Sequence, residues 1–345
     1  MRLWPRAFLF AVLITSGCGL FNNGGYDWSA SFPGNSWQIH QVPDGGYILI
    51  SEDGSTGRSK LLRTDSMFRL TWSVDGDSLG CRGLLFSVRV AADGGYLLVG
   101  GPSGGAGTWL GKTDSSGGLL WGLIMGLSSV GIGCSCPTTD GGCAMIGSAG
   151  GLVELVKVSS DGKIEWQMPG DSGVPYWVAQ TPDCGYLVHG PYGRLCRFDP
   201  AGNAVWSREV NVGTGWDCGY LTPQGECVCT MQPGIAKLDT AGNVKWQTTF
   251  PGSYERIVSV QPTSDGGSIL AGTTDPAHNV ALVKTDSLGK VEWCREFGGD
   301  AYESGTWAEQ TADGGYVVAG VEVSYGLIGF ARRTIRLKKT DASGN

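Results

Sequence analysis

The sequence predicts an all-β fold, a seven-bladed β-propeller of four-stranded blades that occupies residues 26–345. The main observation behind this prediction is a short marker, Asp-Gly-Gly-Tyr in its commonest form, whose copies stand 41 to 49 residues apart. A regular period of this length is typical of propellers and other repeat folds. The seven copies begin at Asp44, Asp93, Asp140, Asp183, Gln224, Asp265 and Asp313, and the copy at Gln224 is degenerate.

A second marker follows each copy and supports the same fold. In the second repeat, Asp114 stands seven residues before Trp121, and Gly117 lies between them. The interval recurs at Asp65/Trp72, Asp199/Trp206, Asp239/Trp246 and Asp286/Trp293, and Ser159/Trp166 keeps it without the acid. Two markers in constant order within each repeat indicate one supersecondary unit that is used again and again.

Each repeat reads as four short strands. In the second repeat the expected strands are 86–90, 96–99, 109–112 and 119–121, with Gly-rich turns between them. Gly adopts positive φ at such turns without steric cost, and Asp bonds its own backbone there. No stretch has a sustained period of 3.6 residues, which argues against a solenoid of alternating strands and helices.

The two ends of the chain are complementary. The last repeat stops at Asn345, so the Trp expected seven residues after Asp341 is absent. At the other end, residues 26–32 match the strand around Trp293. We therefore expect the N-terminal strand, residues 26–32, to complete the seventh blade and close the ring, which removes an exposed sheet edge.

Composition fits a folded β protein and excludes some partners. Gly accounts for 58 of 345 residues, and the 13 Trp residues exclude a disordered low-complexity chain. The net charge is −7, and no cluster of Lys and Arg appears. Nucleic acid is therefore not an expected partner, because its phosphates require clustered positive charge.

The N-terminus predicts export. Arg2 and Arg6 precede the apolar run 7–14, which is too short for the ~20 residues of a membrane-spanning helix and fits a signal peptide over residues 1–17. The run ends in Ile-Thr-Ser-Gly before Cys18, and this segment resembles a bacterial lipobox. The resemblance implies cleavage before Cys18, acylation of its thiol, and a short tether over residues 18–25. An ordinary cleavable signal peptide is the alternative.

A lipid on Cys18 would make the membrane the first partner of the protein. Several acyl chains on one residue anchor a protein stably, at ~0.8 kcal/mol per buried CH₂. Gly19 follows the Cys, and by the same resemblance this favours the outer membrane where the cell has one. We therefore expect an exported lipoprotein of the cell envelope.

The two markers together resemble those of bacterial and archaeal surface propellers with "DGGY…KTDxxGxxxW" repeats, over essentially residues 26 to 345. This resemblance implies a propeller fold and secretion. The second marker alone also resembles the wider quinoprotein-like (PQQ-like) group. Quinone-dependent enzymes of that group typically carry adjacent cysteines at the cofactor, and this sequence has no Cys-Cys pair. We expect no cofactor and no metal ion.

The candidate ligand residues are His40, Arg89 and Glu309. They stand four residues before the first marker of their repeats, on the strands expected to line the central channel. The equivalent residues in the other repeats are Cys136, Ala179, Tyr220 and Gln261. Propellers commonly bind ligands along this channel, so the three polar residues form a candidate binding ring. Alternatively, they only solvate a water-filled channel.

Four cysteines are candidates for disulfide bonds. Cys134 and Cys143 flank the first hairpin of the third blade, and Cys218 and Cys227 occupy the same positions in the fifth. The fourth and seventh blades carry aromatic pairs there, which suggests contact across the strands, and the exported compartment allows oxidation. Buried free thiols are one alternative, and a metal site that includes Cys136 is another. The sequence leaves open the states of Cys81, Cys136, Cys184, Cys196, Cys229 and Cys294.

Two classes of function remain. The first is a non-enzymatic binding or scaffolding lipoprotein whose loops or channel meet a protein or glycan partner. The second is a propeller hydrolase or lyase that uses acidic residues at the channel. We prefer the first because no catalytic motif appears in the sequence, so we assign no catalytic residue. The identity of the partner and the oligomeric state do not follow from the sequence.

Overall fold

The structure is a computed structural model. It describes residues 29–345 except for 54–55, 57, 103–106, 129–133, 173–175, 191–192, 211–217, 232–233, 251–253, 300 and 326–330. The predicted signal peptide (1–17) and tether (18–25), with Cys18, lie outside the described residues.

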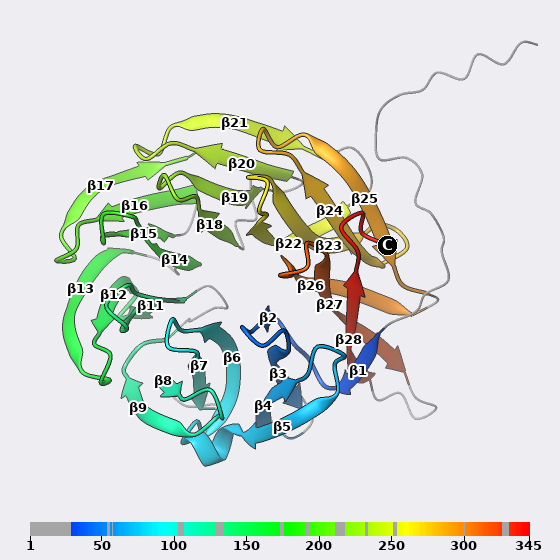
Figure 1. The fold of residues 1–345 in the computed structure, drawn as a ribbon. Helices are drawn as coiled ribbons and strands as arrows, with labels where there is room; N and C mark the ends of the chain where they lie inside the picture. Colours follow the sequence, from blue (N-terminus) through cyan, green and yellow to red (C-terminus); the bar gives the residue numbers. More distant parts are fainter. Residues whose placement is uncertain are drawn as a thin grey trace, which may run out of the picture.

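The described residues form seven four-stranded antiparallel sheets arranged around one axis, as the repeats predict (Figure 1). Blade 1 contains β2 (Ile39–Gln41), β3 (Tyr47–Asp53), β4 (Arg58–Thr64) and β5 (Leu70–Asp75), followed by the 3₁₀ helix η1 (Gly76–Leu79). Blade 2 contains β6 (Gly83–Val90), β7 (Tyr96–Pro102), β8 (Thr108–Thr113) and β9 (Leu119–Met125). Blade 3 contains β10 (Ser135–Pro137), β11 (Cys143–Ala149), β12 (Leu152–Val158) and β13 (Ile164–Ser172).

The remaining blades repeat this order. Blade 4 contains β14 (Trp177–Gln180), β15 (Tyr186–His189), β16 (Arg194–Phe198) and β17 (Ala204–Glu209). Blade 5 contains β18 (Gly219–Leu221), β19 (Cys227–Met231), β20 (Gly234–Leu238) and β21 (Val244–Thr249). Blade 6 contains β22 (Tyr254–Pro262), β23 (Ser268–Thr274), β24 (Val280–Thr285) and β25 (Val291–Phe297). Blade 7 contains β26 (Tyr302–Gln310), β27 (Tyr316–Tyr325), β28 (Ala331–Thr340) and, from the other end of the chain, β1 (Ala30–Pro33).

Blade 7 confirms the predicted ring closure. Strand β1 pairs antiparallel with β28, and Ala30 lies opposite Leu337 and Pro33 opposite Thr334. The first strand thus lies beside the last one in space (Figure 1). The closing strand ends one residue later than the predicted segment 26–32, whose first three residues lie outside the described residues.

The first marker builds a turn that requires its two glycines. In blade 2 the Asp93 carboxylate accepts a hydrogen bond from Gly95 N–H at 3.1 Å. Gly94 has φ of +80°, and a Cβ atom on Gly95 would collide with the carbonyl oxygen of Thr113. Lys112, which precedes the second marker, places its Nζ atom 2.5 Å from Asp93. The marker therefore joins the first turn of a blade to its third strand.

The second marker joins neighbouring blades. The Trp121 ring of blade 2 lies 2.7–3.0 Å from where a Cβ atom on Gly162 of blade 3 would stand, and Gly162 has φ of +83°. Trp121 Nε1 also donates to the Ser160 carbonyl oxygen at 2.9 Å. The same packing occurs for Trp72/Gly117, Trp166/Gly202, Trp206/Gly242, Trp246/Gly289 and Trp293/Gly344. The constant spacing of Gly and Trp in the repeat follows from this contact.

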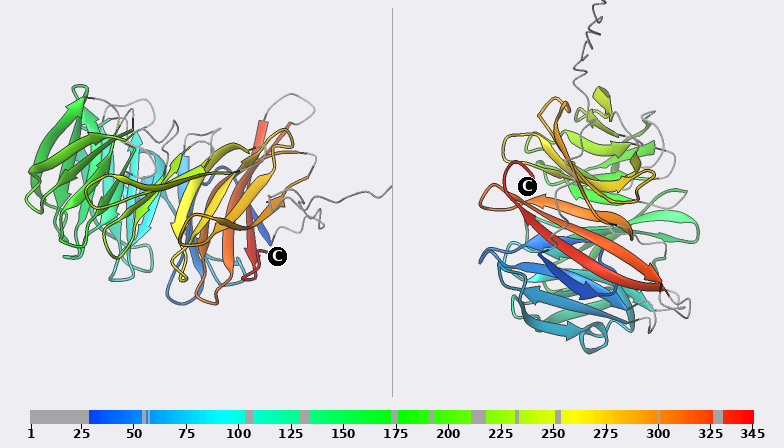
Figure 2. Two further views of the ribbon diagram at one scale, coloured as in Figure 1. Left: turned by 90° about the horizontal axis from the view of Figure 1, so that it is seen from above. Right: turned by 90° about the vertical axis from the view of Figure 1, so that its right-hand side faces the viewer.

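The core lies between the faces of neighbouring blades. All residues of β8 and β24, third strands of their blades, are buried, whereas the outer strand β9 alternates between exposed and partly buried residues. The blades stand side by side around the ring, so that each sheet covers the next (Figure 2). One buried cluster, which runs from Leu97 to Phe198, joins blades 2, 3 and 4.

Candidate functional site

The innermost strand of every blade carries the predicted ligand position in the same register. These strands, which include β2, β6 and β26, surround the centre of the ring (Figure 1). His40 lies opposite Ile48, Arg89 opposite Leu97 and Glu309 opposite Val317, each eight residues further on. The same offset holds for Cys136, Ala179, Tyr220 and Gln261, and all seven residues are partly exposed.

The structure brings His40, Arg89 and Glu309 together with Trp307, and we name these four residues the axial cluster. Glu309 is its anchor. The Glu309 Oε2 atom lies 2.9 Å from His40 Nδ1 and accepts a hydrogen bond from Trp307 Nε1 at 3.4 Å. The other carboxylate oxygen accepts the backbone N–H of Gln41. With three donors around it, the carboxylate is already well satisfied.

Trp307 joins the other two members of the cluster. Its ring meets that of His40 edge to face, with 5.1 Å between centroids and 77° between planes. The guanidinium carbon of Arg89 lies 5.3 Å from the centroid of a Trp307 ring, which is cation–π distance. Trp307 is only 2 % exposed, so it forms a buried support against which the His40 ring and the Arg89 guanidinium pack.

Within the described residues, the Arg89 guanidinium makes a cation–π contact with the Trp307 ring and no hydrogen bond or ion pair. Two thiols lie near it. Burial raises the pKa of the Cys136 thiol to about 11, while a hydrogen bond from the Gln180 backbone and the charge of Arg89 act in the opposite direction. Burial also raises the pKa of the Cys134 thiol, again against the charge of Arg89. Both thiols are therefore neutral near pH 7 and do not neutralise Arg89.

The Nε2 atom of His40 is buried and has no hydrogen-bond partner in the described residues. The Nδ1 atom faces the Glu309 carboxylate, and a carboxylate only accepts hydrogen bonds, so the polar contact of the imidazole is made through Nδ1 and none is made through Nε2. A buried atom of this kind does not meet a ligand unless the side chain rotates. In this arrangement His40 serves to hold Glu309 and Trp307.

The equivalent positions on the innermost strands of the other blades make different contacts. The Tyr220 hydroxyl lies 2.9 Å from Ser268 Oγ, and the Gln261 amide donates toward Cys218 Sγ at 3.9 Å. Ala179 offers no polar group. The charged residues at this level therefore lie in the three adjacent blades 7, 1 and 2.

The predicted disulfide between Cys134 and Cys143 is wrong, since both residues are free cysteines. Cys143 lies opposite Pro137, whereas Ile146 N–H donates to the Cys134 carbonyl oxygen at 2.8 Å. Cys134 is therefore three residues out of register with Cys143. Because side chains alternate between the faces of a sheet, an odd offset turns the two thiols to opposite faces.

Cys218 and Cys227 repeat this arrangement in blade 5, and neither forms a disulfide bond. Cys227 lies opposite Leu221, and Thr230 N–H donates to the Cys218 carbonyl oxygen at 3.1 Å. The aromatic pairs that suggested contact obey the same register, since Trp177 lies opposite His189. Their joint variation reflects packing on two separate faces. Five further cysteines form no disulfide bond either, namely Cys81, Cys136, Cys184, Cys196 and Cys229.

Trp307 is the member of the axial cluster that does not stand at the ligand position four residues before a first marker. It stands two residues before Glu309 on β26, so both side chains point to the same face of the strand. The spacing of two residues along an expected strand was the sequence signal that could have placed Trp307 beside Glu309. In the part of the chain that the structure describes, no His, Cys, Asp or Glu group is arranged to hold a metal ion. No helix among the described residues is long and apolar enough to cross a membrane.

The comparisons with known proteins identify the fold only. No protein-family model matches the chain, and no curated protein sequence matches it. A streptogramin B lyase structure matches with a TM-score of 0.62 at 12 % identity, over 89 % of this chain and 94 % of that chain. Virginiamycin B lyase from Staphylococcus aureus matches with a TM-score of 0.63 at 10 % identity, over 90 % of this chain and 98 % of the lyase chain.

A propeller of a different class matches about as well. The WD40 β-propeller domain of Doa1 has a TM-score of 0.59 at 13 % identity, over 91 % of this chain and 96 % of that domain. At these identities the similarity shows a common fold and carries no function across.

Proposed function

We propose that this protein is a binding propeller of the cell envelope, anchored through a lipid on Cys18, whose axial cluster holds a carboxylate group of a protein or glycan partner. The observation that carries the ligand class is the Arg89 guanidinium, a partly exposed cation on an innermost strand without a carboxylate of its own among the described residues. Guanidinium groups bind carboxylates through two parallel hydrogen bonds.

The surroundings of Arg89 favour binding over a purely structural role. Lys112 and Lys284, which belong to the repeat framework, are buried and paired with Asp93 and Asp265 at 2.5 and 2.7 Å. Arg89 differs from them because the Glu309 carboxylate is held by other donors. An unneutralised cation held against an aromatic ring is preorganised for an anionic group.

The binding test uses the purified full chain and two probes, a short acidic peptide and galacturonic acid, which separate a protein partner from an acidic glycan. Arg89→Gln should weaken binding of the true ligand class about tenfold or more, since a charge-assisted hydrogen-bond pair is lost. Arg82→Gln is the matched control, because Arg82 is exposed and directly precedes β6, the strand that carries Arg89. If neither probe binds, or if both variants bind equally, the proposal is wrong.

A hydrolase or lyase is the second candidate, and the His40–Glu309 pair is the feature that favours it. A carboxylate that orients an imidazole is the usual arrangement of a general base. The burial of His40 Nε2 favours the binding role over catalysis, because no substrate proton reaches that atom in this conformation. Cleaved or unsaturated product from an acidic glycan, lost in His40→Gln but not in Arg82→Gln, would reverse this preference.

The proposed location, a membrane anchor through a lipid on Cys18, is inferred from the N-terminal sequence. Cys18→Ser should move the protein from the membrane to the soluble fraction and abolish labelling by a radioactive fatty acid. Seven residues (19–25) separate Cys18 from the first predicted strand, a reach of at most about 25 Å. Retention of Cys18→Ser in the membrane fraction would contradict the anchor without bearing on the axial cluster.

A further inference from the structure

At three blade boundaries a tyrosine fills the space beside the tryptophan of the preceding blade. The ring centroids lie 6.1 Å apart for Trp72 and Tyr96, 5.5 Å for Trp166 and Tyr186, and 5.4 Å for Trp293 and Tyr316. Each of these tyrosines, the last residue of its first marker, is 2 % exposed. A phenol ring therefore fills this place at three of the six boundaries whose Trp is described, and the other three carry Cys143, Cys227 and Ser268 there.

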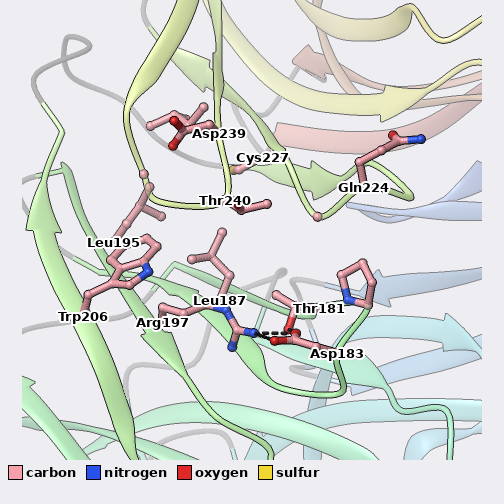
Figure 3. Close-up of a pocket in the computed structure, with 14 residues that line it drawn as sticks. Thr181, Asp183, Leu187, Leu195, Arg197, Trp206, Gln224, Cys227, Asp239 and Thr240 are labelled. Carbon is pink, nitrogen blue, oxygen red and sulfur yellow. Dashed lines mark hydrogen bonds and ion pairs between the residues drawn. The ribbon is translucent and has the colours of Figure 1, made fainter.

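The boundary between blades 4 and 5 lacks this ring. Cys227 occupies the tyrosine position in the degenerate first marker, and the tryptophan opposite is Trp206 of β17. A cavity of about 270 Å³ lies between them, and Leu187 and Leu195 form apolar parts of its wall (Figure 3). Leu238 also lines it. Ligand pockets are of this kind, and apolar cavities as small as ~150 Å³ bind benzene.

The cavity keeps the polar neighbours of the missing tyrosine. In blade 2 the Tyr96 hydroxyl donates to the Ser115 carbonyl oxygen at 3.4 Å. Burial raises the pKa of Tyr96, and the neighbouring Arg63 guanidinium acts in the opposite direction. The repeat equivalents of Arg63 and Ser115 at the cavity are Arg197 and Thr240, and both line it (Figure 3).

Arg197 is fixed in place at the cavity rim. Its Nη2 atom donates to both oxygens of Asp183 at 2.5 and 2.6 Å, and Nη1 donates to the Phe198 carbonyl oxygen. The rim is therefore ordered and polar while the interior is apolar. Such a site favours a flat ring with one hydroxyl group.

We infer that this cavity, the blade 4–5 pocket, binds a small monocyclic phenol in the place of the tyrosine that the repeat has lost. The ring lies against Trp206 between Leu187 and Leu195, and the hydroxyl group points to the rim at Thr240. The pocket shares no residue with the axial cluster, so a test of this inference is independent of the proposed function.

The probe is p-cresol, which is the tyrosine side chain itself, titrated into the purified full chain by calorimetry. We expect saturable binding of one molecule per chain. Cys227→Tyr should restore the ring from within, weaken p-cresol binding about tenfold or more, and keep or raise the melting temperature. Cys143→Ser, at the same repeat position in blade 3, is the matched control and should bind as the unaltered chain does.

A second measurement works without any variant. Saturating p-cresol should slow alkylation of Cys227, which lines the pocket, and leave the exposed Cys184 unchanged, as followed by peptide mass spectrometry. Absence of saturable binding to the unaltered chain overturns the inference. So does equal affinity in folded Cys227→Tyr, or, where that variant does not fold, equal alkylation of Cys227 with and without p-cresol.

Discussion

The blade boundaries and the propeller axis differ in how much the residue type varies between equivalent positions of the repeat. At six boundaries among the described residues, a Trp of one blade lies against a Gly with φ near +80° in the next blade. At the axis, seven equivalent positions carry seven different residues, namely His40, Arg89, Cys136, Ala179, Tyr220, Gln261 and Glu309. The boundary contacts hold the ring together and leave little choice of residue, whereas the axis is free to differ from blade to blade.

This difference separates residues of the fold from residues of a site. A contact that recurs in every blade satisfies the same packing requirement each time, so it says little about a ligand. A polar group that occurs in one blade only, such as Arg89, is not explained by a packing requirement that all blades share. The axial cluster and the blade 4–5 pocket are both departures from the repeat.

Loss of the closing strand should have the largest effect. Deletion of residues 26–34 removes β1 and exposes the backbone of β28, so we expect loss of the cooperative unfolding transition and aggregation. A copy of residues 26–34 joined after Asn345 should restore folding, because it would supply the fourth strand of blade 7 from the other end. Thermal unfolding followed by circular dichroism measures both. An unchanged transition in the deleted chain would show that closure does not stabilise the ring.

Two glycines with the same backbone geometry give the next test. Gly162 and Gly94 have φ of +83° and +80°, but a Cβ atom would meet the Trp121 ring only at Gly162, whereas Gly94 has open space. Gly94→Ala should cost about 1–2 kcal/mol for its left-handed conformation. Gly162→Ala adds the displacement of Trp121 and should cost roughly 3 kcal/mol. Chemical denaturation of both variants compares them, and equal losses would mean that the Trp–Gly contact contributes nothing.

The fold could be predicted from the sequence because its determinants are local and repeated. The turn of the first marker depends on an Asp and two glycines within four residues, and the Trp–Gly contact returns at a constant spacing. Ring closure followed from matching the residues around Trp28 to those around Trp293. Each of these signals is a pattern of residue types along the chain.

The site could be predicted only in part, for reasons of register and distance. The common offset of the innermost strands placed His40, Arg89 and Glu309 at one level, but the sequence did not say that they would share Trp307. The cysteine pairs failed because the register of a hairpin depends on its turn, and a shift of three residues reverses the face. The blade 4–5 pocket arises between two sheets, so spacing along one repeat does not reveal it.

Acid should weaken the first-marker turns. Hydrogen bonds from Lys339 and Thr311 lower the pKa of Asp313 to about 2, from an ordinary value of 3.8. A lowered carboxyl pKa stabilises the folded state above about pH 4, and this contribution disappears as the pH falls toward 2. The pKa is lowered likewise in Asp44, Asp93, Asp140, Asp183 and Asp265.

Urea unfolding at pH 6 and pH 3 measures this contribution. Asp313 is 66 % exposed, so its ion pair with Lys339 should be worth only about 0.5–1 kcal/mol. Asp313→Asn should lose this amount at pH 6 and less at pH 3, because at pH 3 the carboxyl of the unfolded chain, with its ordinary pKa of 3.8, is already largely protonated. A variant with the same deficit at both pH values would show that charge does not drive the effect.

The smallest effect on stability is expected at the axis itself. Arg89 makes one close contact among the described residues, over the Trp307 ring, and such a contact is worth about 0.5–1 kcal/mol. Arg89→Gln should therefore change the free energy of unfolding by no more than that amount, while Glu309→Leu should cost about 1–3 kcal/mol because it strands the donors of His40, Gln41 and Trp307. Within one cluster, the anchor would thus be structural and the cation dispensable to the fold. A large loss in Arg89→Gln, comparable to that in Glu309→Leu, would place Arg89 among the residues of the fold and remove the reason to regard it as a ligand group.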